Sequence, residues 1–185
     1  MTDRERLKAL LVERSVRLGD FTLASGARSS YYVDARVTTM SAEGQARLGK
    51  VAWDALDASG IRPTHVGGLT MGADPVAYAI ARESFVRGHP VDGFSVRKQA
   101  KEHGTGQRIE GGLPEDARCL IVEDSMTTGG SALKAIEAVR EHGAEVVGVL
   151  TVVDRQEGGE KALEHTGLPL VALYTGPELL EAAGG

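Results

Sequence analysis

The chain has 185 residues, enough for one domain with a substantial hydrophobic core, and its 42% hydrophobic and 25% charged residues are typical of a globular protein. Its formal net charge of -5 argues against a protein that coats nucleic acid or covers a membrane surface, because both need an excess of basic residues. No apolar run approaches the ~20 residues of a membrane-spanning helix, so we expect neither nucleic acid nor a membrane among its partners.

The start of the chain and its cysteine content bear on the compartment. The N-terminal stretch MTDRERLKAL is charged and lacks the apolar segment of a signal peptide. The single cysteine, Cys119, cannot form an intrachain disulfide. We therefore expect a cytoplasmic protein.

The first half of the chain alternates helical and strand-like patterns. Apolar residues at helical spacing predict helices over residues 3–17, 41–58 and 74–86. Ser41 is the expected N-cap of the second of these helices, and Gly60 is expected to end it. Short strands are predicted at residues 21–23, 31–37, 65–69 and 91–96. The polar, glycine-rich residues 97–116 have no periodicity and are interpreted as a long, functional or disordered loop.

The second half continues the alternation. The continuous apolar run at 118–124 predicts a strand that is covered on both faces. Further strands are predicted at 145–153 and 170–174, and helices at 131–142, 159–166 and 177–183. Strands that alternate with helices indicate an α/β fold with a mostly parallel sheet. Ligands of such sheets bind beyond the carboxyl ends of the strands, which is where residues 121–131 lead.

Residues 121–131, IVEDSMTTGGS, combine the features of an anion site. Backbone N–H groups from Thr127 to Ser131 can point into one concavity at the start of a helix, whose dipole adds positive potential. Gly129 and Gly130 let the backbone approach an anion closely, and the hydroxyls of Thr127, Thr128 and Ser131 add donors. The string is neither a Walker A loop nor a dinucleotide-binding glycine motif.

Two acids, Glu123 and Asp124, precede this loop. Carboxylates repel phosphate, but they accept hydrogen bonds from vicinal hydroxyls and can help to hold Mg²⁺. A phosphate loop beside two acids therefore suits a ribose 5-phosphate. A generic strand-to-helix turn would also explain the two acids alone. The whole string resembles the 5-phosphoribosyl 1-pyrophosphate (PRPP) signature of the type I phosphoribosyltransferases, which includes Ser125 and Met126.

Residues 94–112, FSVRKQAKEHGTGQRIEGG, narrow the family. They resemble the mobile catalytic loop of the orotate phosphoribosyltransferases, and Arg97, Lys98, Lys101 and His103 match its pattern position by position. Four potential cations in seven residues of an acidic protein also suit a multiply charged anion such as pyrophosphate. A solvated run of charges is the alternative interpretation.

Three shorter segments carry the same resemblance. FTLASGARSSYYVDAR (21–36) resembles the family's N-terminal hood, although an ordinary β-hairpin would also explain it. VGGLTMGADPVA (66–77) resembles the segment that meets pyrophosphate through its backbone. VVDRQEGG (152–159) places Arg155 where the family uses an arginine against the orotate carboxylate, a task that suits the planar guanidinium.

The resemblance implies a type I phosphoribosyltransferase fold in a single domain. Its parts are a small hood (about 1–40 plus the C-terminal segment), a core (about 41–175) and a mobile catalytic loop (about 97–112). The implied reaction transfers the phosphoribosyl group of PRPP to orotate, giving orotidine 5′-monophosphate and pyrophosphate, in de novo pyrimidine biosynthesis. The implied enzyme is a homodimer whose catalytic loop reaches the neighbouring subunit's site.

The resemblance also implies roles for individual residues. Lys101, His103 and Asp124 are the expected catalytic residues, and Thr127 and Arg155 are expected to bind orotate. Mg²⁺ is the expected cofactor, held mainly through PRPP and water. PRPP is expected to contact Arg97, Lys98, Lys101, His103, Glu123, Asp124, Ser125, Met126, Thr127, Thr128, Gly129, Gly130 and Ser131.

Two positions depart from the family pattern, and two other functions stay open. Ala24 and Gly72 stand where the family often has lysine, so two cations are missing. We expect Arg97, Lys98, Lys101 and Mg²⁺ to carry that charge instead. A purine phosphoribosyltransferase would share the 123–131 loop, and a non-catalytic sensor of PRPP would keep the ligand site without its chemistry.

Overall fold

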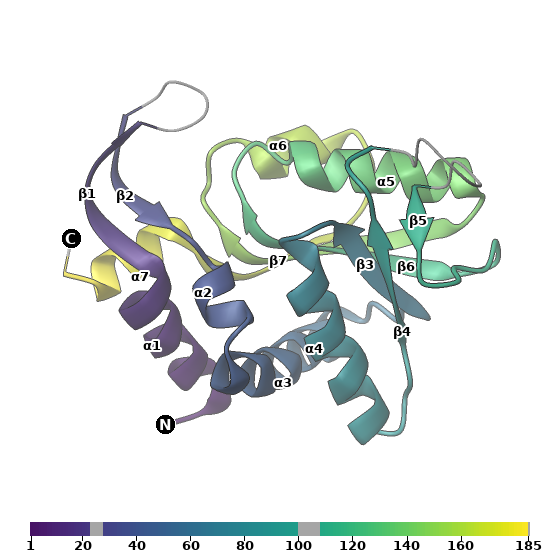
Figure 1. Cartoon of the computed structure of the whole chain (residues 1–185), viewed down its shortest axis with the longest axis horizontal. Coiled ribbons are helices and arrows are strands. Elements are labelled where there is room, and N and C mark those ends of the chain that lie inside the picture. Colours follow the sequence, from purple (N-terminus) through teal and green to yellow (C-terminus); the bar gives the residue numbers. More distant parts are fainter. Residues whose placement is uncertain (23–27, 100–107, 185) are drawn as a thin grey trace.

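The computed structural model describes residues 1–22, 28–99 and 108–184, which form helices and strands in alternation (Figure 1). In chain order the elements are α1 (Asp3–Ser15), β1 (Val16–Thr22), β2 (Arg28–Val33), α2 (Arg36–Thr39), α3 (Ala42–Ser59), β3 (His65–Leu69), α4 (Ala73–Val86), β4 (Asp92–Val96), β5 (Ile109–Glu110), β6 (Arg118–Met126), α5 (Gly130–His142), β7 (Glu145–Asp154), α6 (Gly159–Glu164), β8 (Leu170–Thr175) and α7 (Gly176–Ala182). Within these ranges no helix is both long and apolar enough to cross a bilayer.

A six-stranded sheet forms the centre of the molecule. Its strand order is β5-β4-β3-β6-β7-β8, with every neighbouring pair parallel except β4 and β5. Helices cross over between the parallel strands and cover both faces of the sheet (Figure 1). The predicted α/β fold with a mostly parallel sheet is confirmed.

The side chains of β6 show why this strand is apolar throughout. Leu120 and Val122 pack into the hydrophobic cluster that includes α3 and α4, whereas Cys119 and Ile121 pack into the cluster around α5. All four are fully buried. A strand with both faces covered cannot alternate apolar and polar residues. Burial also raises the pKa of the Cys119 thiol to about 12, which leaves it unreactive.

Local signals place both ends of α3 as predicted. Ser41 caps α3, because its hydroxyl accepts a hydrogen bond from the Gly44 N–H at 3.1 Å. Gly60 ends α3 in the left-handed conformation at φ 73°.

The N-terminal segments differ from the prediction. Both strands begin earlier than expected, the first is also longer, and they pair antiparallel from Val16 opposite Val33 to Thr22 opposite Arg28. Val16, expected in the first helix, therefore begins β1. Val37, expected in a strand, lies in α2, where the neighbouring Thr38 hydroxyl donates to the Leu10 carbonyl at 3.1 Å. These pairings join residues that are distant in sequence, so local periodicity could not show them.

Two further expectations are corrected. Phe85, one of the apolar residues at helical spacing that predicted the helix at 74–86, was expected to face the core but is 76% exposed. The 97–116 segment is not loop throughout, because β5 adds to the edge of β4 and the Arg97 N–H donates to the Arg108 carbonyl at 2.7 Å. Lys101 and His103 lie in 100–107, outside the described residues.

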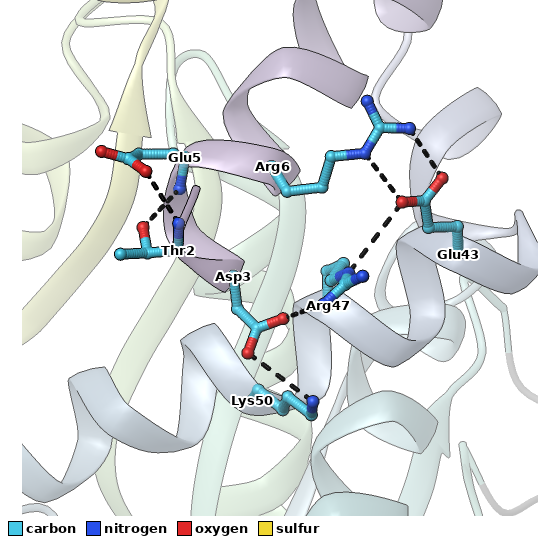
Figure 2. Close-up of polar contacts among 7 residues, drawn as sticks. All are labelled: Thr2, Asp3, Glu5, Arg6, Glu43, Arg47 and Lys50. Atoms are coloured by element: carbon cyan, nitrogen blue, oxygen red, sulfur yellow. Dashed lines mark hydrogen bonds and ion pairs between the residues drawn. The ribbon is translucent and has the colours of Figure 1, made fainter.

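A charged cluster fastens α1 to α3 (Figure 2). Arg6 binds Glu43 through two parallel hydrogen bonds, of 2.7 Å from Nε and 2.8 Å from Nη2. Asp3 accepts a hydrogen bond from Arg47 and lies 3.6 Å from the Lys50 ammonium. The N-terminal helix that leads into the β1–β2 hairpin is thus attached to the core.

Candidate active site

A cavity of about 960 Å³ opens at the carboxyl ends of β3, β6 and β7, the edge of the sheet where a ligand was predicted. Its wall includes residues of the hairpin region (Arg17, Phe21, Tyr32, Asp34, Arg36), of the segment after β3 (Thr70, Met71, Gly72), of the β6–α5 junction (Glu123, Asp124, Ser125, Thr127, Thr128, Ser131), and Lys98, Arg155 and Glu157. Most of the residues predicted from the 121–131 string therefore share one cavity.

The β6–α5 junction has the form of an anion site. Gly129 adopts the left-handed conformation, φ 76°, and a Cβ there would lie 3.1 Å from the Gly159 carbonyl oxygen. The first turn of α5 contains no acidic residue, and its N-cap is Gly129, which has no side chain to cap the helix. The Ala132 N–H bonds the Glu123 carboxyl, whereas the N–H groups of Gly130 and Ser131 lack intrahelical acceptors and remain available to an anion in the cavity.

Met126 differs from its neighbours in this junction. Its side chain is fully buried in the hydrophobic cluster beneath the loop, and a Cβ on Gly159 would lie 2.7 Å from it. Its predicted contact with a ligand can therefore come only from its backbone.

Glu123 and Asp124 form an acidic pair in an enclosed position. Glu123 is 8% exposed, and burial raises the pKa of its carboxyl to about 7, an effect that the Ser131 hydroxyl and the Ala132 N–H partly offset. Burial also raises the pKa of Asp124. Within the described part of the chain, Glu123 Oε2 has no hydrogen-bond partner. A buried carboxyl oxygen without a partner is costly, which is consistent with a site for a ligand hydroxyl.

The segment after β3 lies against Asp124. A Cβ on Gly72 would be 2.3 Å from Asp124 Oδ1, so any side chain at position 72 would displace this carboxylate. Asp74 holds the same segment in place, because it accepts hydrogen bonds from the Thr70 hydroxyl at 2.7 Å and the Ser95 hydroxyl at 2.6 Å. The close packing of Gly72 gives a physical reason for glycine at this position.

Arg155 is presented at the end of β7. The Asp154 carboxylate accepts a hydrogen bond from the Gln156 N–H at 2.8 Å and so fixes the turn. The Arg155 guanidinium carbon lies 4.4 Å from the centre of the Tyr31 ring, and its Nε donates to the Tyr31 hydroxyl at 3.3 Å. Its Nη2 is 2.9 Å from Glu157 Oε1, although not at a hydrogen-bonding angle, and no other described residue satisfies it.

The predicted loop cations do not all face the cavity. Lys98 lines it. Arg97 instead donates to Glu110 on β5 at 2.8 Å and is not among the lining residues.

Sequence reasoning gave no role to several lining residues, namely Arg17, Tyr32, Asp34 and Arg36. It also gave no role to Tyr31, which supports Arg155. The hood resemblance included Tyr31, Tyr32, Asp34 and Arg36 as part of a string without separate roles, and Arg17 lay outside that string.

Comparison with known proteins agrees with this geometry. A model of the phosphoribosyl transferase domain matches residues 41–166, so the fold is that of a phosphoribosyltransferase. The orotate phosphoribosyltransferase of Aquifex aeolicus (strain VF5) is 45% identical over 183 residues, covering 97% of this chain and 99% of that protein. That of Rhodopseudomonas palustris (strain BisB5) is 46% identical over 181 residues, 96% of both chains. This chain belongs to the orotate phosphoribosyltransferases.

Solved structures show the same relationship. The orotate phosphoribosyltransferase of Mycobacterium tuberculosis H37Rv in complex with Fe(III) dicitrate has a TM-score of 0.85 and 43% identity, covering 96% of this chain and 99% of that one. The same protein in complex with PRPP has a TM-score of 0.79 and 40% identity, with coverage of 96% and 99%. An adenine phosphoribosyltransferase from Leishmania donovani, 18% identical with a TM-score of 0.65, shares the fold alone; it covers 99% of this chain and 85% of that one.

Proposed function

We propose that this chain catalyses the reaction of its family in the cavity described above. As an orotate phosphoribosyltransferase, it transfers the phosphoribosyl group of PRPP to orotate in pyrimidine biosynthesis, forming orotidine 5′-monophosphate and pyrophosphate. The observation that supports this location most strongly is the start of α5, where Gly129 offers no side-chain cap, beside the buried acids Glu123 and Asp124. A phosphate site and a diol site side by side in one cavity suit a ribose 5-phosphate.

We assign the 5-phosphate to residues 127–131. The N–H groups of the first turn of α5 and the hydroxyls of Thr127, Thr128 and Ser131 are the donors for its oxygens. Gly129 and Gly130 keep side chains out of the path of the phosphate, and Ser125 continues the wall of the cavity.

The ribose hydroxyls are assigned to Glu123 and Asp124. The unpartnered Glu123 Oε2 can accept from a hydroxyl, which would offset the cost of burying it. As the bond from C1 to pyrophosphate breaks, positive charge develops on the ribose ring. The carboxylate of Asp124 stabilises that charge in a site of low dielectric constant, and this is its catalytic role.

Orotate is assigned to Arg155 and the backbone near Thr127. The Arg155 guanidinium can pair with the orotate carboxylate, and its packing on Tyr31 holds it in position before orotate binds. A ring nitrogen of orotate attacks C1 of the ribose and loses its proton to the departing pyrophosphate or to solvent, a C–N bond forms, and the electrons of the broken C–O bond leave with pyrophosphate. The protein itself supplies no nucleophile for this step.

The pyrophosphate is assigned to the backbone of the 70–72 segment, Lys98 and the catalytic loop with Arg97, Lys101 and His103. Lys101 would neutralise the leaving group, and His103 would donate a proton or hydrogen bond to it. For Arg97 this requires release from Glu110, its partner in the described state. Loop closure would support the transfer by keeping water away from C1.

Orotate phosphoribosyltransferases generally use Mg²⁺ with PRPP. Among the described residues no cluster of three or more histidine, cysteine or acidic side chains could hold a metal. Glu123 and Asp124 offer only two carboxylates, which fits an ion bound mainly through PRPP oxygens and water. When bound, Mg²⁺ would neutralise charge on the pyrophosphate.

The reaction assay tests this assignment directly. When purified protein is mixed with PRPP, Mg²⁺ and orotate, the absorbance of orotate should fall as it is consumed. Adenine, hypoxanthine and uracil in parallel tubes should not react. Turnover of a purine in place of orotate would contradict the orotate assignment, and tight PRPP binding without any turnover would favour a sensor.

A homodimer with shared active sites is part of the proposal. The exposed apolar side chains of Val37, Met40 and Met71, which line a second hollow beside the cavity, support a protein contact here. Mixing Lys101→Ala with Arg155→Ala protein tests the sharing. If the loop acts in the neighbouring site, mixed dimers contain one intact site and roughly a quarter of the activity returns on random pairing. Without sharing, every site keeps one defect and activity stays lost.

The cytoplasmic location is also part of the proposal, supported by the single cysteine, which lies buried in β6.

A further inference from the structure

The hairpin region brings a guanidinium to the cavity. Arg36, the first residue of α2, lines the cavity although it lies almost 90 residues before the PRPP motif. Asp34 holds it through two parallel hydrogen bonds, 2.9 Å from Nε to Oδ1 and 3.1 Å from Nη2 to Oδ2. The same carboxylate accepts the backbone N–H of Arg36 at 3.2 Å. Such a bidentate pair fixes the plane of the guanidinium before any ligand binds.

The surroundings place Arg36 at one particular end of the cavity. The charge of Asp124 is among the causes that raise the pKa of Arg36, so these two groups interact across the cavity. Arg36 and Met71 line the neighbouring hollow together, and Gly72 packs against Asp124. Arg36, Asp124 and the 71–72 segment therefore meet at the same place.

The other anionic groups of the substrates already have sites elsewhere. The 5-phosphate belongs at residues 127–131 and the orotate carboxylate at Arg155. The pyrophosphate of PRPP is left with the part of the cavity formed by the 70–72 segment, Lys98 and Arg36. This step rests on the proposed function.

That part of the cavity needs cations from outside the 70–72 segment. Gly72 cannot carry a side chain while Asp124 keeps its position, and Asp34 and Asp124 add negative charge nearby. Arg36 stays 43% exposed while paired with Asp34. Its guanidinium has five N–H donors, and the two hydrogen bonds to Asp34 engage one edge of it.

We propose that Arg36, positioned by Asp34, binds the pyrophosphate group of PRPP and is a substrate-binding residue of this enzyme. The hairpin region thereby contributes a cation where the segment after β3 contributes only backbone. Asp34 acts through Arg36 and is a positioning residue.

The test compares two probes that differ in the group recognised. Binding of inorganic pyrophosphate with Mg²⁺, and of ribose 5-phosphate, is measured by calorimetry for wild type, Arg36→Gln, Arg36→Lys and Asp34→Asn. Arg36→Gln should weaken pyrophosphate binding, and raise the KM for PRPP, by about tenfold or more. Ribose 5-phosphate affinity and the KM for orotate should stay within about twofold, because no charge-assisted bond to either is lost. Arg36→Lys should recover part of the loss.

The control is Arg62→Gln, which removes an arginine in the segment before β3 that pairs with Asp57 and does not line the cavity. It should change none of these values, and thermal unfolding should show that all variants are folded. Unchanged pyrophosphate affinity in Arg36→Gln, or equal weakening of both probes, would show that Arg36 is only structural. The binding comparison needs no turnover, so it tests whether Arg36 binds pyrophosphate even if the orotate assay shows no reaction.

Discussion

Two charged regions of this molecule use similar side chains in opposite ways. In the cluster between α1 and α3, every charged side chain drawn has an oppositely charged or hydrogen-bonding neighbour, although the buried Arg47 Nε, 3.9 Å from Glu43 Oε1, makes no hydrogen bond; Thr2 and Glu5 complete a capping box at the start of α1 (Figure 2). At the β6–α5 junction, Glu123 Oε2 has no partner among the described residues, and Gly129 at the N-cap of α5 has no side chain.

This difference in pairing distinguishes the α1–α3 cluster, which holds the fold together, from the β6–α5 junction, which we propose binds substrate. Polar groups that are paired within the chain hold elements together, whereas buried polar groups without partners raise the free energy of the unliganded fold. Glu123 lines the cavity, so a ligand can satisfy its Oε2, whereas Arg47 Nε has only the charge of the nearby Glu43 carboxylate. Breaking each region should therefore have different consequences, large for catalysis at the junction and small for stability at the cluster.

The largest effect is expected from Asp124→Asn. Removing the charge that stabilises the developing positive ribose should lower kcat by about 10²–10³-fold. The fold should be at least as stable, because burial disfavours the charged form of Asp124. Steady-state kinetics and urea unfolding measure the two quantities. Asp116→Asn, at an exposed turn, is the control. A wild-type kcat in the Asp124→Asn enzyme would show that Asp124 has no catalytic role.

The pH dependence of stability should reveal Glu123. Its pKa is about 7 in the folded protein and near 4.5 when unfolded, so the folded chain binds more protons between these values. Its contribution is fully present below pH 4.5 and is lost as pH rises to about 7, by about 3 kcal/mol in the free energy of unfolding.

Glu123→Gln isolates this contribution. The stability of the variant relative to wild type should rise through this window and level off above pH 7, as followed by urea unfolding. Subtraction removes the opposite trend of carboxyls whose pKa is lowered, such as Asp34 beside Arg36. The exposed Glu115→Gln variant should show no such rise, and a flat difference for Glu123→Gln would contradict the buried, raised carboxyl.

Arg155→Gln should weaken the binding of orotate and leave that of PRPP nearly unchanged. Loss of the charge-assisted pair should raise the KM for orotate by about ten- to a hundredfold and change the KM for PRPP little. Arg140→Gln, which alters an exposed arginine on α5, serves as the matched control. Equal changes in both KM values would show a general disturbance of the cavity.

The smallest effect is expected in the charged cluster between α1 and α3. Glu43→Gln removes the partner of Arg6 but leaves α1 packed on α3. The midpoint of thermal unfolding should therefore fall by about 2 °C, and kcat and KM should be unchanged. A loss of activity comparable to that of Arg155→Gln would mean that the attachment of α1 also controls the site.

Local patterns predicted much of the fold because their causes are local. Ser41 and Gly60 bracket α3 through contacts within one helical turn, and the apolar run of β6 follows from burial on both faces. The 121–131 string likewise carries its chemistry within eleven residues, since the strand end, the acids and the start of α5 are consecutive. These features needed only neighbours in sequence.

The sequence by itself determined the α/β alternation, the phosphate loop and the family resemblance. Only the tertiary structure decided that Arg36 reaches the cavity beside Asp124, that Gly72 packs against that carboxylate, that Arg97 pairs with Glu110, and that Tyr31 supports Arg155. Each of these contacts joins segments on different elements. Their positions depend on how the hairpin region and the loops fold onto the sheet, and no spacing along the chain records that arrangement.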